Sequence, residues 1–192
     1  MAYLSEEELH FLGFKYLGKN VKISDKACIY NPEKITIDDY SRIDDFCILS
    51  GNIQIGKFCH ITPMCLIAGG TPGVFLGDFC TLAYGVKIFS QSDDYSGLSM
   101  VNSLIPKKYK NEILLPVKIE KQVIVGTNSV IFPGVTIEEG CAIGAMSLLL
   151  KSTTSWGIYI GNPAYRLRER DKNIATLELD FLKEMNNDYS IQ

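Results

Sequence analysis

The fold of this chain is decided by residues 119–149, IEKQVIVGTNSVIFPGVTIEEGCAIGAMSLL. Branched aliphatic residues recur there at every sixth position: Ile119, Val125, Ile131, Ile137, Ile143 and Leu149. A period of six matches neither an amphipathic helix, which repeats near 3.6 residues, nor a two-sided strand, which repeats at two. It is the period of a hexapeptide β-helix, in which the chain winds around three flat faces.

The same frame covers most of the chain. Earlier aliphatic residues at sixth positions form three blocks: Leu17, Ile23 and Ile29; Ile37, Ile43, Leu49, Ile55, Ile61 and Ile67; and Leu76, Leu82 and Ile88. All blocks together hold eighteen such positions, which is six turns of three hexapeptides. We therefore predict an all-β fold, a parallel β-helix of about six coils over residues 17–154.

Three insertions interrupt the frame. Two, three and twenty-five extra residues follow Ile29, Ile67 and Ile88, each of which is the third aliphatic residue of its turn. All insertions should therefore leave the column at one corner, where the longest forms a loop over residues 91–116. Insertions in solenoid proteins gather on the working face, so this corner is the expected place of the functional site.

A second register concerns the cysteines. The position four residues after each aliphatic residue is usually small, and five of the six cysteines occupy it: Cys47, Cys59, Cys65, Cys80 and Cys141. We expect these thiols to point inward and pack as small apolar groups. The chain has no CxxC pair, so the cysteines predict no metal site.

The two ends differ from the repeats. Ser5 and Glu8 form the pattern of a capping box, which predicts a helical cap over residues 1–16. Residues 155–192 form a C-terminal segment in which Ile174, Leu177 and Phe181 have helical spacing. We expect this helix to cover the far end of the column or to grip a neighbouring copy. The whole chain, residues 1–192, is predicted to be one domain.

Composition excludes several classes of protein. The 192 residues carry a net charge of −3 and no basic block, which argues against nucleic acid as a partner. The apolar runs are far shorter than the roughly 20 residues that a membrane helix needs. Because the N-terminus also has no apolar signal region, we expect a cytoplasmic protein that does not bind membranes.

The hexapeptides, together with the ending Gly161-Asn162-Pro163-Ala164, resemble the left-handed β-helix acyltransferases. This group contains the maltose and galactoside O-acetyltransferases and the sugar acyltransferases of O-antigen gene clusters. The resemblance implies a left-handed column, a homotrimer and acetyl-CoA or a related thioester as donor, with no metal. It also places active sites in clefts between adjacent columns, beneath the long corner loop.

The same resemblance implies a set of residues along the CoA channel. Ala145 and Ser147 match the coils that face the thioester, and Asn162 and Pro163 match the end of the channel. Cations near the CoA phosphates would then come from Lys151, Arg166 and Arg168, because phosphates need positive partners. A solvent-exposed surface role explains each of these three cations equally well.

One family residue is missing. In the O-acetyltransferases a histidine at the start of the long loop accepts the proton of a sugar hydroxyl, and here that position is Asp93, followed by Asp94. A hydroxyl needs a base near neutral pH, whereas a neutral amine is already nucleophilic and needs mainly positioning. The aspartate pair therefore favours an amino-sugar acceptor. The loop sequence SDDYSG, residues 92–97, also resembles that of O-antigen enzymes acting on dTDP-4-amino-4,6-dideoxyglucose.

His60 is the alternative base. It occupies the last place of its hexapeptide and should point outward one turn below the long loop, where it could act within one chain or across a subunit boundary. The predicted function is acetyl-CoA-dependent N-acylation of a nucleotide-linked amino deoxysugar in polysaccharide precursor synthesis. The alternative is a sugar O-acetyltransferase with His60 as base. A zinc enzyme on the same column would need about three clustered histidines, and the chain has two.

Overall fold

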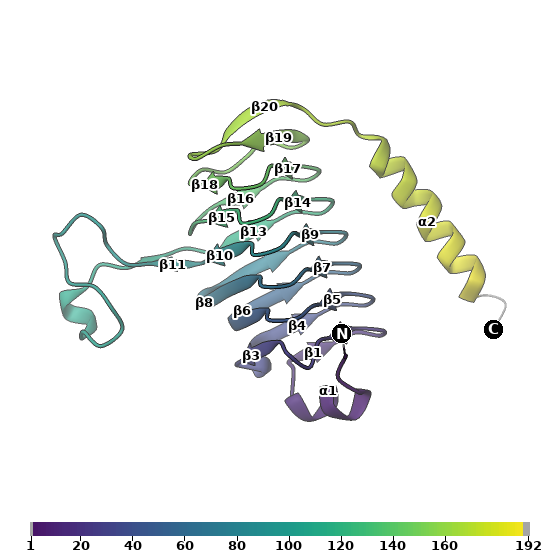
Figure 1. Cartoon of the computed structure of the whole chain (residues 1–192), viewed down its shortest axis with the longest axis horizontal. Coiled ribbons are helices and arrows are strands. Elements are labelled where there is room, and N and C mark those ends of the chain that lie inside the picture. The colour runs from purple at the N-terminus through teal and green to yellow at the C-terminus, as the bar shows by residue number, and fades with distance from the viewer. Residues whose placement is uncertain (1, 190–192) are drawn as a thin grey trace.

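The computed structural model describes residues 2–189, with the side chains of residues 2–185. It confirms the parallel β-helix, a column of stacked coils with a short helix at its base (Figure 1). The column continues past Leu149 into a seventh turn. There the N–H of Thr153 donates to the carbonyl of Thr136, and the next strand pairs with Ile143 through Tyr159. The prediction of about six coils therefore falls short by part of one turn.

The strands form three faces. The first face holds β1 (Tyr16–Leu17), β4 (Ile35–Ile37), the second halves of β6 (Ile48–Ile55) and β8 (Leu66–Leu76), β13 (Val117–Ile119) and β16 (Thr136–Ile137). The second face holds β2 (Lys22–Ile23), β5 (Arg42–Ile43), β7 (His60–Ile61), β9 (Thr81–Leu82), β14 (Ile124–Val125), β17 (Ala142–Ile143) and β19 (Gly157–Ile160). The third face holds β3 (Cys28–Tyr30), the first halves of β6 and β8, β10 (Lys87–Phe89), β15 (Val130–Ile131) and β18 (Leu148–Leu149).

The repeating aliphatic residues fill the centre of the column. Ile43, Ile61 and Leu82 stand directly above one another in neighbouring strands, and none of the three is exposed. The five predicted inward cysteines are also buried, whereas Cys28 is exposed. The neighbouring thiol of Cys65, through a hydrogen bond, and burial both raise the pKa of the Cys47 thiol. Among the described residues no group of histidine, cysteine and carboxylate side chains is arranged to hold a metal ion.

The three insertions do leave the column at one corner, between the third and first faces, which we call the loop corner. The first insertion forms the short helix η1 (Pro32–Lys34). The second lies within β8, which passes through the corner as one strand while its register with β6 shifts. The long insertion begins and ends in an antiparallel pair, β11 (Gln91–Ser92) with β12 (Ile113–Leu114), and contains η2 (Lys107–Tyr109). It projects away from the column (Figure 1).

The C-terminal helix α2 (Asn173–Tyr189) runs beside the column rather than over its end (Figure 1). It lies at the corner between the first and second faces, which we call the helix corner. Phe58 stacks on Tyr40 and Phe79 there, with ring centroids 5.0 and 4.9 Å apart, and Phe181 of α2 meets Phe58 edge-on at 5.2 Å. The far end is covered instead by β20 (Tyr165–Glu169), which pairs antiparallel with β19.

The N-terminal helix α1 (Glu6–Leu12) closes the other end. The predicted capping box is present, because the N–H of Ser5 donates to Glu8 Oε2 at 2.7 Å and the N–H of Glu8 donates to Ser5 Oγ at 3.3 Å. Leu9 of α1 is buried against the first coil. In the part of the chain that the structure describes, neither helix has the length and apolar character to span a membrane.

A core substitution tests the column. Leu82→Ala removes a side chain that is 0% exposed and leaves a cavity, so we expect the free energy of unfolding to fall by about 2–5 kcal/mol. Leu179→Ala on α2, where the side chain is 60% exposed, is the control and should change it by less than about 0.5 kcal/mol. Urea unfolding measures both values. Equal losses in the two variants would contradict an aliphatic core at these positions.

Candidate active site

A pocket lies where the long loop leaves the column. Its volume is about 250 Å³, and its lining residues are Phe89, Gln91, Ser92, Asp93, Tyr95 and Phe132. Phe89 and Phe132 point outward from the third face in consecutive coils, so the start of the loop partly covers two aromatic rings of that face. The pocket combines an apolar wall with one carboxylate, which is a composition suited to an amino sugar.

The two loop aspartates have different surroundings. Asp94 is held by the loop itself: its Oδ1 accepts the N–H of Ser96 at 2.8 Å, and its Oδ2 accepts the hydroxyls of Ser96 and Ser99 at 2.9 and 2.8 Å. The hydrogen bonds from Ser96, and then that from Ser99, lower the pKa of the Asp94 carboxyl. Asp93 lines the pocket, and its Oδ2 accepts a long contact of 3.4 Å from the N–H of Asn102. Asp94 therefore shapes the loop, while Asp93 presents a carboxylate to the pocket.

His60 points outward from β7, as predicted, with 36% of its side chain exposed. Its Nε2 lies 2.8 Å from Oδ2 of Asp44, whose side chain is only 2% exposed. Arg42 donates to the same oxygen through Nη2 at 2.9 Å, and its Nε lies 2.9 Å from Asp44 Oδ1. The Asp44 carboxylate raises the pKa of the Arg42 guanidinium, so the aspartate is paired with a lasting positive charge.

This cluster selects the tautomer of the neutral imidazole. A carboxylate only accepts hydrogen bonds, so Nε2 of His60 must carry the hydrogen that points to Asp44. The neutral ring then has its lone pair on Nδ1, the nitrogen that does not contact Asp44. Sequence reasoning identified His60 but missed Arg42 and Asp44. The signal was available, because Arg42 stands eighteen residues before His60 and is its direct neighbour in the register.

Of the predicted CoA residues other than the cations, Ala145, Asn162 and Pro163 are exposed and Ser147 is buried. Ala145 and the segment 161–164 both lie at the corner between the second and third faces, where the N–H of Leu148 donates to the carbonyl of Gly161 at 3.0 Å and its carbonyl accepts the N–H of Ala164 at 2.8 Å. Asn162 and Pro163 are exposed there and joined by a cis peptide bond. Ser147 belongs to the same coil, but its side chain is buried and its hydroxyl donates to the carbonyl of Gly144 at 2.7 Å.

Two of the three predicted cations share one strand, and the third belongs to a different part of the last coils. Lys151 is exposed at the loop corner, two residues after the end of β18. Arg166 and Arg168 belong to β20, and both are exposed. Arg166 is paired with Glu169 at 2.6 Å, and this hydrogen bond raises the pKa of its guanidinium. Lys151 and Arg168 are therefore better placed than Arg166 to meet a phosphate without breaking an ion pair.

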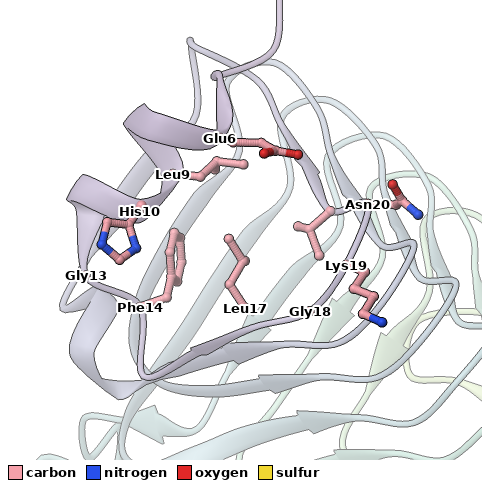
Figure 2. Close-up of a pocket in the computed structure, with 10 residues that line it drawn as sticks. Glu6, Leu9, His10, Gly13, Phe14, Leu17, Gly18, Lys19 and Asn20 are labelled. Carbon is pink, nitrogen blue, oxygen red and sulfur yellow. The ribbon is translucent and has the colours of Figure 1, made fainter.

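A larger cavity, about 670 Å³, lies beneath α1 at the base of the column (Figure 2). Figure 2 shows Leu9, Phe14 and Leu17 pointing into it, with Glu6 and Lys19 near its margin. It forms the space between the cap helix and the first coil. Because Asp93, His60 and the 161–164 segment do not line it, its size does not make it the reaction site.

The chain is similar in sequence to a known protein over nearly its whole length. No family profile matches the chain. The chain is 40% identical over 184 residues to a dTDP-4-amino-4,6-dideoxy-D-glucose acyltransferase of Escherichia coli, which covers 94% of this chain and 95% of that protein.

Solved structures that are similar to this chain are also acyltransferases. The chain superposes with a TM-score of 0.95 and 44% identity on AntD, an N-acyltransferase from Bacillus cereus in complex with dTDP and 3-hydroxybutyryl-CoA, covering 96% of this chain and 98% of the other. A variant of AntD in complex with dTDP-4-amino-4,6-dideoxyglucose and coenzyme A gives a TM-score of 0.94 at 44% identity, covering 95% and 98%. A maltose O-acetyltransferase from Clostridium difficile shares the fold alone, with a TM-score of 0.60 and 20% identity over 86% and 75%.

The loop geometry predicts a pH effect. The folded loop favours the ionised form of the Asp94 carboxyl and so lowers its pKa. The stabilisation of the loop by this carboxylate is therefore complete above the ordinary pKa of 3.8, and it is lost as the pH falls through the lower pKa of the folded state. Asp94→Asn should speed hydrogen exchange of the Ser96 amide at pH 7, with a difference from the unmodified chain that shrinks below pH 3.8. Asp93→Asn is the control and should leave this amide protected. A difference that persists at low pH would contradict the assignment.

Proposed function

Because this chain belongs to the family of hexapeptide-repeat sugar-nucleotide N-acyltransferases, we propose that it acylates the 4-amino group of dTDP-4-amino-4,6-dideoxyglucose. The chain is an acyl-CoA-dependent acyltransferase, since its relatives over nearly their whole length carry that activity. The observation that supports the amine acceptor is the Asp93 carboxylate in the aromatic pocket at the base of the loop. A carboxylate there binds an ammonium, whereas a hydroxyl would gain nothing comparable from it.

The reaction is direct attack of the amine on the thioester. Asp93 orients the ammonium, a base takes one proton, and the neutral nitrogen attacks the thioester carbonyl carbon. The new C–N bond forms as the C–S bond breaks, and the amide nitrogen releases a second proton. The departing CoA thiolate takes one of these protons and solvent receives the other. The buried cysteines form no acyl-enzyme, since their thiols are enclosed in the column.

We assign the binding site of the acyl donor to the corner where Ala145, Asn162 and Pro163 are exposed. Their exposed surfaces offer a channel wall for pantetheine, while the buried hydroxyl of Ser147 supports the coil rather than the ligand. Lys151 and Arg168 are the cations proposed for the CoA phosphates. The donor in this assignment is acetyl-CoA, with 3-hydroxybutyryl-CoA as the larger thioester to compare.

We also propose a homotrimer that works in the cytoplasm on precursors of an O-antigen or related surface polysaccharide. All six cysteines are free, which fits a reducing compartment. The exposed tip of the long loop, with Leu98 and Leu104 about nine-tenths exposed, supports contact with a second copy.

A substrate comparison tests the function. We expect the chain to acylate dTDP-4-amino-4,6-dideoxyglucose with acetyl-CoA or 3-hydroxybutyryl-CoA, and to leave maltose and a simple galactoside unmodified. Release of free thiol measures the rate, and mass spectrometry of the sugar product identifies the bond. Acylation of a hydroxyl at a higher kcat/KM would overturn the proposal and favour the O-acetyltransferase alternative.

A single substitution tests the carboxylate. Asp93→Asn keeps the size of the side chain and removes its charge, so kcat for the amino sugar should fall by about tenfold or more. Asp180→Asn, on the exposed surface of α2, is the matched control and should retain the original rate. Equal kcat in the two variants would show that Asp93 does not position the amine.

A further inference from the structure

The aromatic wall of the loop pocket belongs to one row of outward side chains on the third face. Each member of the row directly follows an inward aliphatic residue, and the parallel register stacks the members above one another. From the first coil to the sixth, the row consists of Tyr30, Ser50, Ala68, Phe89, Phe132 and Leu150. Its side chains therefore change from small to aromatic at the fourth coil, where the long loop leaves the column.

The pocket has two chemically different sides. Phe89 and Phe132 form the side that belongs to the column, and neither ring carries a hydrogen-bonding group. The other side belongs to the loop and is polar throughout: Gln91, Ser92, Asp93 and Tyr95. Of these six lining residues only Asp93 is charged. A ligand in this pocket therefore meets a carboxylate from one side and an apolar surface from the other.

The loop side is fastened to the column beside the rings. Ser90, the last residue before the loop, is buried, and its Oγ lies 2.6 Å from the carbonyl oxygen of Gly69 and 3.1 Å from that of Ala68. The returning end of the loop is held by the same residue, because the N–H of Leu115 donates to the carbonyl of Ser90 at 3.1 Å. Asp93, three residues beyond this anchor, therefore has a defined position in the pocket.

We propose that Phe89 and Phe132 contact the C6 methyl group of the bound sugar and so select a 6-deoxy sugar over its 6-hydroxyl counterpart. The inference rests on the proposed acylation of the 4-amino group and adds two specificity-determining residues to that site. In a pyranose ring C5, which carries C6, is bonded directly to C4. When Asp93 holds the ammonium on C4 from the loop side, C6 is the neighbouring substituent, and it meets the aromatic side of the pocket.

The two rings treat a methyl group and a hydroxymethyl group differently. A methyl group leaves water and gains apolar contact with the rings, which is favourable. A hydroxyl group in the same place loses its hydrogen bonds to water and finds no donor or acceptor on either ring. The transition state is therefore bound more weakly for the 6-hydroxyl sugar, although its amine and the thioester are unchanged.

The first experiment compares two acceptors that differ by one oxygen atom. These are dTDP-4-amino-4,6-dideoxyglucose and dTDP-4-amino-4-deoxyglucose, each with acetyl-CoA as donor and with release of free thiol as the measure of rate. We expect kcat/KM to be about 10- to 100-fold higher for the 6-deoxy sugar, because an apolar pocket rejects an added hydroxyl to about this extent. Equal kcat/KM for the two sugars would overturn this inference and leave the proposed amine acylation intact.

The second experiment assigns the preference to the rings. Phe132→Ala admits water beside C6, and the preference for the 6-deoxy sugar should fall by about fourfold or more, since the contact with one methyl group is lost. Phe89→Ala should act in the same direction. Phe132→Leu keeps an apolar side chain and should retain the preference. Tyr30→Ala is the control in the same row, because this side chain is 58% exposed in the first coil, three coils below Phe89.

Each preference is a ratio of two rates measured on one sample, so a smaller fraction of folded enzyme does not change it. An unchanged preference in both Phe89→Ala and Phe132→Ala would overturn the assignment to these rings, and so would an equal fall in Tyr30→Ala. No thiol release by the unmodified chain with either amino sugar would overturn the proposed function and, with it, this inference.

Discussion

The parallel hydrogen bonding of each coil to the next is the constraint on which everything else depends. Backbone pairing between successive coils, eighteen residues apart wherever no insertion intervenes, places Ile43, Ile61 and Leu82 in one vertical row and fixes what each outward position faces. Arg42 and His60 meet Asp44 for this reason, and Phe89 and Phe132 form one wall for the same reason. A change in the register of one coil would therefore shift several of these contacts together.

Most of the fold could be read from the sequence because a column of identical layers repeats its own pattern. The aliphatic frame located the faces, and the three frame breaks located the loop corner. The start of a seventh turn escaped this reading because Thr153 and Tyr159 replace the aliphatic residues that mark the other turns. The position of α2 was also missed. Its apolar spacing predicts a helix, but only the stacked rings of Tyr40, Phe58 and Phe79 determine where it lies.

The candidate site was less predictable because its residues depend on side-chain partners. Sequence reasoning treated Asp93 and Asp94 as a pair, whereas the serines of the loop bind Asp94 and leave Asp93 to face the pocket. Ser147 was expected along the donor channel, yet its hydroxyl serves the backbone of its own corner. His60 became interpretable once the buried carboxylate of Asp44 was seen beside it. The period of the coils places Arg42 beside His60, but it does not indicate which groups form hydrogen bonds with Asp94 or Ser147.

The strands at the two ends have a consequence for how the chain behaves at high concentration. Stacked parallel coils leave a row of unpaired backbone groups at each end, and such rows invite end-to-end growth into fibrils. Here β20 crosses the upper row in the antiparallel direction, and Tyr3 bridges Ser24 in the same sense at the lower one. Reversing the strand direction breaks the template that an incoming coil would need, so the solenoid has a built-in stop against polymerisation.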